Sequence, residues 1–170
     1  MKVRNLKMYS SEKEMYPDVI FWLNTYLQHK YPEATVKSYD TSRENLCEFI
    51  RRHKLNKYFS ESETYVVKVD VTGVVIYKEK CFLAFVECKL NSISLKDVSQ
   101  IIGYSKVVKP VLSLIVSPKG ISPPVNSLIN IYRRYDILTY QDNLKVRIAK
   151  WNKSTKDIDV STLLPHGEHL

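Results

Sequence analysis

The middle of the chain contains two apolar segments, YVVKVDVTG (residues 65–73) and CFLAFVECK (residues 81–89), joined through a short turn around residues 77–80. The second segment is a nearly continuous apolar run that ends in charged residues, which is the pattern of a strand buried on both faces. The two segments are therefore predicted to form a β-hairpin inside a sheet. Because side chains alternate along a strand, Glu87 and Lys89 are expected on one face and the Cys88 thiol on the other.

Pairing of these two strands is expected to bring Asp70 beside Glu87. Two partly buried carboxylates repel each other, and unless one is protonated the usual remedy is a hard divalent cation such as Mg2+. A neighbouring ammonium group, here Lys89, can orient a metal-bound water or offset charge that builds on a phosphate. The alternative is an ordinary Glu–Lys pair on a strand face, with an aspartate near a bulge at Gly73, since charged pairs are common in sheets.

The order of Asp70 and then Glu87-Cys88-Lys89 resembles the PD-(D/E)XK nuclease superfamily, with Val69 standing where that motif usually has a proline. The resemblance covers about residues 10–140. It implies an α/β fold with a mixed central sheet flanked by helices, that is, a restriction-endonuclease-like αβββαβ core. It also implies that Asp70, Glu87 and the Cys88 backbone carbonyl bind Mg2+ or Mn2+, and that Lys89 is catalytic in the hydrolysis of a DNA phosphodiester bond.

An amphipathic helix is expected before the hairpin, with apolar residues from Met15 to Leu27 on one side. Proline is tolerated only in a first helical turn, so Pro17 requires a helix that either kinks or begins near Tyr16. In many members of the superfamily a glutamate on the N-terminal helix reaches the metal or its water, and the resemblance gives this catalytic role to Glu14. Capping or solvent exposure is the other interpretation of Glu14, and Glu12 takes its place if the register differs by half a turn.

A basic helical insertion is expected at residues 41–63. Thr41 and Glu44 have the spacing of a capping box that opens a helix. Cations crowd the end of this helix, where they either are solvated and favour the helix dipole or contact DNA phosphates. The second interpretation assigns DNA binding to Arg51, Arg52, Lys54 and Lys57.

Ser94 and Asp97 predict the start of another helix shortly after Lys89. Gln100 and Tyr104 lie four residues apart and share the side of this helix opposite its apolar stripe, which includes Leu95. A Gln-x-x-x-Tyr pair at this position resembles the additional motif of lambda-exonuclease-like and RecB-type nucleases, where it contacts DNA near the metal site. The alternative is a solvated helix face. The terminal cysteines that bind an iron–sulfur cluster in that branch are missing.

The remaining elements complete a single domain over residues 1–170. Residues 2–7 are expected to be an arm, residues 35–39 an edge strand, residues 111–116 a buried strand, and residues 122–132 a helix. Residues 136–140 are expected to be the last core strand, residues 144–151 an edge strand, and residues 152–170 a polar, frayed tail. Alternation of strands and helices implies crossover connections.

Composition narrows the class of protein. A net charge of +8 favours a polyanionic partner, with nucleic acid preferred over a membrane. The three cysteines lack metal-ligand spacing and fit reduced thiols in a cytoplasmic protein. Neither a membrane-spanning run nor a signal peptide is expected, and the lack of a glycine-rich phosphate loop argues against nucleotide-driven motors and dinucleotide enzymes.

The sequence thus predicts an Mg2+-dependent deoxyribonuclease. One alternative is a Holliday-junction-resolvase-like endonuclease acting as a homodimer. The small size, the basic charge and the N-terminal glutamate favour it, whereas the insertion at residues 41–63 and the Gln100/Tyr104 pair oppose it. The other alternative is a non-cleaving nucleic-acid-binding module with the same fold, for which the basic charge suffices. The presence of Asp70, Glu87 and Lys89 argues against a non-cleaving protein, because such a protein has little reason to keep two acids that repel each other.

Overall fold

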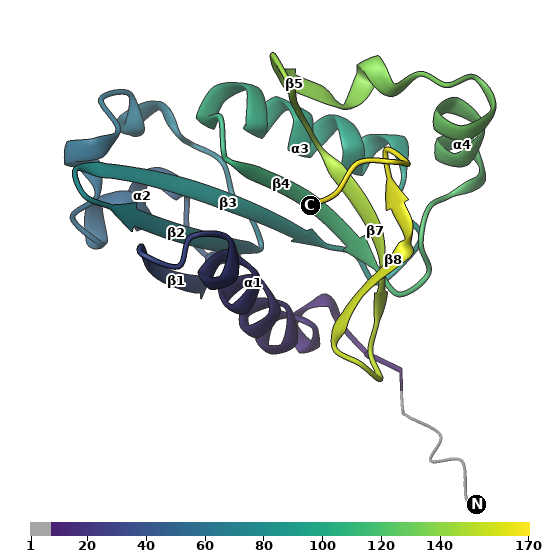
Figure 1. Ribbon diagram of the computed structural model, residues 1–170, viewed down its shortest axis with the longest axis horizontal. Helices are drawn as coiled ribbons and strands as arrows, with labels where there is room; N and C mark the ends of the chain where they lie inside the picture. The colour runs from purple at the N-terminus through teal and green to yellow at the C-terminus, as the bar shows by residue number, and fades with distance from the viewer. Residues whose placement is uncertain (1–7) are drawn as a thin grey trace, which may run out of the picture.

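The computed structural model describes residues 8–170, so the expected arm at residues 2–7 lies outside the described residues. A mixed six-stranded sheet forms the centre of the molecule (Figure 1). Across the sheet its strands are, in order, β1 (Thr35–Asp40), β2 (Val71–Tyr77), β3 (Lys80–Cys88), β4 (Leu112–Ser117), β7 (Arg147–Asn152) and β8 (Asp157–Leu164). The pairs β3–β4 and β4–β7 are parallel, and the other pairs are antiparallel.

The predicted β-hairpin is present as β2 and β3, with Val71 opposite Val86 and a turn at residues 78–79. Strand β2 begins only at Val71, however, and residues 65–69 are not part of it. Their backbone carbonyls are used elsewhere, because those of Tyr65 and Val67 accept hydrogen bonds from the first turn of helix α2 (Leu46–Arg52). Asp70 therefore lies immediately before the strand.

Helix α1 (Tyr16–Lys30) packs on one face of the sheet and begins at Tyr16, with Pro17 in its first turn as the sequence requires. Leu23 and Leu27 belong to a core that also contains residues of β2, β3, β4 and β7. Gly73 of β2 permits the close approach of this helix. A Cβ atom added at Gly73 would lie 2.5 Å from Leu27 Cδ1 and 3.1 Å from Leu23 Cδ2.

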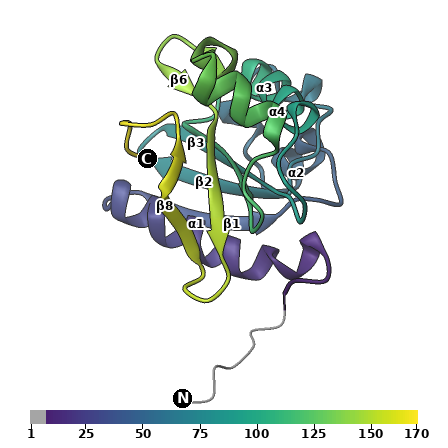
Figure 2. The same ribbon diagram turned by 90° about the vertical axis from the view of Figure 1, so that its right-hand side faces the viewer.

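The other face of the sheet carries α2, α3 (Leu95–Val108) and the short α4 (Pro123–Asn126), as the views in Figures 1 and 2 show. Helix α2 packs with Phe49 against a cluster that includes Phe85 of β3. Helix α3 packs with Ile101 against a cluster that includes Ile115 of β4 and Ile148 of β7. Its predicted capping box is confirmed, since Ser94 is the N-cap and Asp97 occupies the third helical position.

The predicted start of α2 is wrong. Asn45 and Glu48 form its capping box, and Thr41 and Glu44 lie before the helix. The Thr41 hydroxyl is instead buried between two backbone segments, where it donates to the Val69 carbonyl at 2.6 Å and lies 2.8 Å from Thr72 Oγ1. Thr41 thus ties the segment after β1 to the start of β2 rather than capping a helix.

The predictions for the last third of the chain are also wrong in part. Residues 135–138 form a 3-10 turn, and the strand that follows, β5 (Thr139–Gln141), pairs with β6 (Leu144–Lys145) in a separate small sheet. The position beside β4 belongs to β7, which is an inner strand and not the predicted edge. The helix expected at residues 122–132 is α4 followed by a π-helical turn (Ser127–Ile131).

The predicted polar tail contains the edge strand β8. Ile158, Leu163 and Leu164 are buried despite the polar residues between them. Arg147 holds the segment after β8 in place, because its buried guanidinium donates to the backbone carbonyls of Leu164, Pro165 and Glu168. No helix within residues 8–170 is long and apolar enough to cross a membrane.

Two glycine substitutions test the packing of α1 on β2. Gly73→Ala is expected to destabilise the protein by about 1–3 kcal/mol, because its methyl group overpacks the contact with Leu27. The control is Gly103→Ala in α3, where an added Cβ has no neighbour within 4 Å. This control is expected to stabilise the protein by roughly 0.5–1 kcal/mol through helix propensity. Urea unfolding measures both free energies, and a Gly73→Ala variant as stable as the wild type would contradict the packing.

Candidate functional site

The charged residues of the hairpin lie at one edge of the sheet. Because β3, β4 and β7 run parallel, their C-terminal ends share this edge, and antiparallel β2 begins there. Glu87 and Lys89 stand at the end of β3, and Asp70 stands just before β2. In open α/β sheets, ligands characteristically bind beyond the carboxyl ends of the strands.

Asp70 is held by one hydrogen bond to each carboxylate oxygen. Its Oδ1 accepts from the Tyr16 hydroxyl at 2.8 Å, and its Oδ2 accepts from the Cys88 backbone N–H at 2.8 Å. Burial raises the pKa of Asp70 above its ordinary value, although both hydrogen bonds act in the opposite direction. Burial and the charge of Asp70 also raise the pKa of Tyr16, so that Tyr16 remains a protonated donor.

Glu87 is the most buried acid of the site, with 5% of its surface exposed. Its Oε1 accepts from Lys89 Nζ at 3.0 Å, whereas its Oε2 is buried and has no hydrogen-bond partner within residues 8–170. Burial, together with the charge of Asp70, raises the pKa of Glu87 to about 7. Asp70 and Glu87 therefore share one electrostatic environment, as expected from the pairing of their strands.

Lys89 and Cys88 point in the predicted directions. Burial lowers the pKa of Lys89, but the neighbouring charges, chiefly that of Glu87, raise it by more, so the net shift is upward. Lys89 thus keeps its positive charge next to the acids. The Cys88 thiol packs in the core under α1, where burial raises its pKa well above the ordinary value, so only its backbone faces the site.

Of the two candidate glutamates near the N-terminus, the structure brings Glu12 to the site. Glu12 Oε1 accepts from the Leu90 backbone N–H at 3.3 Å, and the charge of Glu12 contributes to the raised pKa of Asp70. Glu14 is exposed and accepts hydrogen bonds from the backbone N–H and hydroxyl of Ser10. The geometry therefore matches the alternative register, in which Glu12 takes the position assigned to Glu14.

Helix α3 approaches the site through Asp97. Asp97 Oδ2 accepts from the Ser94 backbone N–H at 2.8 Å, while Oδ1 lies 3.9 Å from Lys89 Nζ. Gln100 follows Asp97 by three residues and so lies one turn further along the same side of the helix. Tyr104 does not have the solvated environment expected for it, because its ring packs against the cluster that contains Phe85. Leu95, assigned to the apolar stripe, is instead 41% exposed.

The cations of the insertion are not brought together with these acids. Arg51 forms an ion pair with Glu63, and Arg52 forms one with Glu44. Residues 41–63 contain five Lys and Arg against four Glu, so the insertion is helical as predicted but carries a net charge of only +1. In Figure 1, α2 lies toward the end of the sheet where β3 begins, not where β3 ends.

Three lysines missed by the sequence analysis lie at or just beyond the C-terminal ends of β4 and β7, at the edge of the sheet that bears the acids. Lys119 follows β4, and its Nζ donates to Asn91 Oδ1 at 3.0 Å. Lys150 is exposed in β7 opposite Ser117, and Lys153 Nζ lies 4.1 Å from the centre of the Tyr9 ring. Lys150 and Lys153 also line a cavity of about 310 Å3. In the sequence, these lysines are recognisable only as lysines near the ends of strands. That pattern indicates a shared surface only when β7 is known to run parallel to β4.

The donor set of the site fits a hard cation. Among residues 8–170, no group of three or more His, Cys, Asp and Glu side chains could hold a metal ion. Mg2+, however, is usually bound through one or two carboxylates and keeps several waters. Each oxygen of Asp70 uses one of its two lone pairs in the observed hydrogen bonds. The buried Glu87 Oε2 has no hydrogen-bond partner in the described part of the chain. Two crowded acids with unused oxygen lone pairs are suited to such a cation.

No family model matches this sequence, and no match appears among curated proteins or solved structures. At the level of fold class, the expected α/β architecture with a mixed sheet is confirmed, and the elements α1-β1-β2-β3-α3-β4 follow one another along the chain, with α2 after β1. Activity has to be inferred from the site itself.

The raised pKa of Glu87 predicts how stability changes with pH. Between the ordinary value of 4.5 and about 7, the folded state retains a proton that the unfolded state releases, so stability falls as the pH rises through this window. Glu87→Gln removes this titration. In EDTA, we expect the variant to gain roughly 2–3 kcal/mol relative to the wild type between pH 5 and pH 8.

Urea unfolding at the two pH values measures this gain. Glu63→Gln, which removes an exposed carboxylate, controls for the change in net charge. A constant difference between Glu87→Gln and the wild type at both pH values would show that Glu87 is ionised with no added cost in the folded protein.

Proposed function

We propose that this chain is a metal-dependent nuclease that hydrolyses DNA phosphodiester bonds. The observation that carries the proposal is Glu87 Oε2, which is buried and has no hydrogen-bond partner within residues 8–170. It lies beside Asp70 and the charged Lys89 at the carboxyl edge of parallel strands. The order of these residues matches the PD-(D/E)XK motif, and the succession of elements around them is compatible with that fold. The net charge of +8 supports a polyanionic substrate.

Asp70, Glu87 and the Cys88 carbonyl would hold Mg2+ or Mn2+. In an extended strand the N–H and C=O of one residue point to the same side. The Cys88 carbonyl is therefore directed toward the side where its N–H meets Asp70. When bound, such a cation supplies an activated water and stabilises charge on the phosphate. Tyr16 and the Cys88 N–H fix the orientation of the Asp70 carboxylate for this role.

Lys89 would stabilise negative charge on the phosphate and position the attacking water. Its ammonium is already oriented at 3.0 Å from Glu87 and needs no rearrangement to keep its charge. Glu12, anchored on the Leu90 N–H, would accept a hydrogen bond from water at the same edge. Gln100 and Tyr104 would contact the DNA strand along α3, with Tyr104 contributing packing as well.

Phosphate contacts are assigned to Lys119, Lys150 and Lys153 in preference to the insertion cations. These three lysines lie at or just beyond the C-terminal ends of β4 and β7, on the edge of the sheet that bears Glu87. Arg51 and Arg52 lie on α2 and form ion pairs with glutamates of the insertion itself. A strand bound across this edge would meet the acids and the lysines together. Contacts to phosphates fix the orientation of a protein on the DNA and do not read the base sequence.

A non-cleaving nucleic-acid-binding module is the second candidate. It is favoured by one observation, the net charge of +8, which suffices for binding a polyanion without cutting it. The same basic edge would serve it. The two candidates differ in whether DNA is cut when Mg2+ or Mn2+ is added.

Cleavage assays on linear, circular and branched DNA with Mg2+, Mn2+ or EDTA test the nuclease proposal. Asp70→Ala and Glu87→Ala are each expected to abolish cutting while DNA binding persists, because affinity comes mostly from phosphate contacts elsewhere. Glu63→Ala, which removes an acid of the insertion, is the matched control and should cut at the wild-type rate. Full activity in either site variant would refute the assignment, and uncut DNA with every metal in the wild type would favour the binding module.

The proposed phosphate contacts of Lys119, Lys150 and Lys153 are tested by the salt dependence of DNA binding, measured in EDTA so that the DNA stays intact. Replacing Lys119, Lys150 and Lys153 together by Gln is expected to reduce the slope of log K against log salt by about 2–3, near 0.9 for each lost phosphate contact. The matched triple variant replaces Arg43, Lys54 and Lys57 of the insertion by Gln and loses the same charge. Equal effects of the two triple variants would mean that net charge, not this edge, drives binding.

A further inference from the structure

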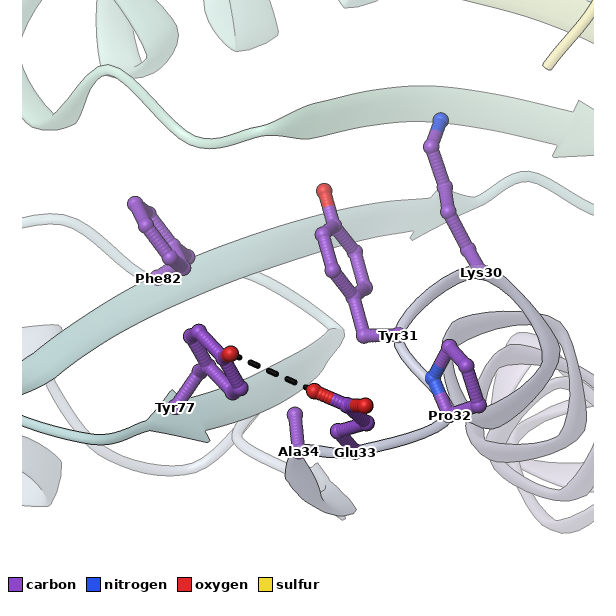
Figure 3. A pocket seen from close by; sticks show the side chains of 7 residues that line it. All are labelled: Lys30, Tyr31, Pro32, Glu33, Ala34, Tyr77 and Phe82. Carbon is purple, nitrogen blue, oxygen red and sulfur yellow. Dashed lines mark hydrogen bonds between the residues drawn. The ribbon is translucent and has the colours of Figure 1, made fainter.

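An aromatic-lined cavity lies at the other end of the β2–β3 hairpin from Asp70 and Glu87. Its volume is about 330 Å3, which is within the usual range for small-molecule pockets. Figure 3 shows three rings around one space, from Tyr31 after α1, Tyr77 at the end of β2 and Phe82 near the start of β3. The cavity exists because α1 ends at Lys30 and leaves this part of the hairpin uncovered. Six residues of β2, roughly 20 Å of extended chain, lie between Asp70 and Tyr77 in the cavity wall.

Three residues of the cavity wall are positioned by hydrogen bonds or strand pairing within the protein. The Tyr77 hydroxyl donates to Glu33 Oε2 at 3.2 Å, and the dashed line in Figure 3 marks this contact. The Tyr31 backbone N–H donates to the Leu27 carbonyl at 2.8 Å and so closes the end of α1. Phe82 is placed by its pairing with Val75. A preformed pocket loses less conformational entropy on binding.

The charges at the rim select the class of ligand. Lys30 lines the cavity, and its Nζ donates to the Tyr26 hydroxyl at 2.8 Å. Lys78 is not a lining residue, but its Nζ lies 5.0 Å from the centre of the ring of Tyr77, which is one. Aromatic rings with an acid can bind either an ammonium compound or a flat heterocycle. Lys30 in the wall and Lys78 beside Tyr77 repel an ammonium ligand and attract a phosphate. The Glu33 carboxylate adds an acceptor for the N–H groups of a base.

We propose that this cavity binds an unpaired nucleotide. Its base stacks on the rings of Tyr31 and Phe82, Glu33 accepts from N–H groups on the edge of the base, and Lys30 and Lys78 contact the phosphate. Guanine is the favoured base because its edge offers both ring and amino N–H donors. Binding here is independent of phosphodiester cleavage, since it uses none of the residues at the edge of the sheet that bears Asp70 and Glu87. On a longer strand, this site would hold a nucleotide remote from the hairpin end that bears Asp70 and Glu87.

Binding of GMP, measured by calorimetry in EDTA, tests the proposal. Tyr31→Ala and Phe82→Ala are each expected to weaken binding about tenfold, as loss of one stacking contact does. Phe82→Leu retains apolar volume without a ring face, and its folding can be checked by circular dichroism, so it serves if Phe82→Ala is unstable. Phe21→Ala removes a ring on α1 that is 73% exposed and remote from the cavity, and it should bind as the wild type does.

The polar contacts are tested by comparison of ligands. Glu33→Gln is expected to weaken binding of GMP more than that of UMP. The double variant Lys30→Gln, Lys78→Gln is expected to remove the preference for GMP over guanosine. Absence of GMP binding by the wild type, or equal binding by Phe82→Leu and Phe21→Ala, would overturn the proposal. Binding of tetramethylammonium in preference to GMP would overturn it in favour of a cage for methylated ammonium groups.

Discussion

The hydrogen bond that the Cys88 N–H donates to Asp70 Oδ2 is the constraint on which the candidate site depends. It extends the β2–β3 ladder one step beyond its last pair, Val71 and Val86, with a side-chain oxygen in the place of a backbone carbonyl. Asp70 is thereby held near Glu87 although it lies outside the strand, and burial with like charge raises the pKa of both acids. Tyr16 attaches the start of α1 to the same carboxylate, so one helix and two strands meet at a single group.

The sequence was sufficient where a local pattern defines an element. The hairpin and the capping box at Ser94 depend on spacing within a few residues, and the structure contains both. Pro17 left two alternatives for α1, a kink or a start near Tyr16, and the structure has the start at Tyr16. The order of strands at the end of the chain could not be predicted in this way. Periodicity identifies a strand but not its partner, and the position beside β4 is decided by long-range pairing with β7. The predicted tail likewise becomes β8 only because β7 offers it a partner.

The residues of the candidate site likewise fall into those that local sequence patterns could place and those that depend on the tertiary structure. Register alone was enough to place Asp70 near Glu87, and alternation was enough to put Lys89 on the face of Glu87. The choice between Glu12 and Glu14 depends on a single 3-10 turn, whose rotation no periodic pattern encodes. Lysines at the ends of β4 and β7 come together only through the parallel sheet. The insertion was overestimated as a basic surface because residue counting near a helix end ignores the glutamates that pair with its arginines.

Asp97 divides its two oxygens between unrelated tasks. One oxygen satisfies the backbone at the start of α3, and the other lies 3.9 Å from the Lys89 ammonium. The first turn of this helix and the position of the amine are therefore mechanically linked. The same ammonium lies closer to Glu87, at 3.0 Å. Lys89 therefore bridges an acid of the sheet and an acid of the helix, and the charge that offsets Glu87 is shared with the N-terminal turn of α3.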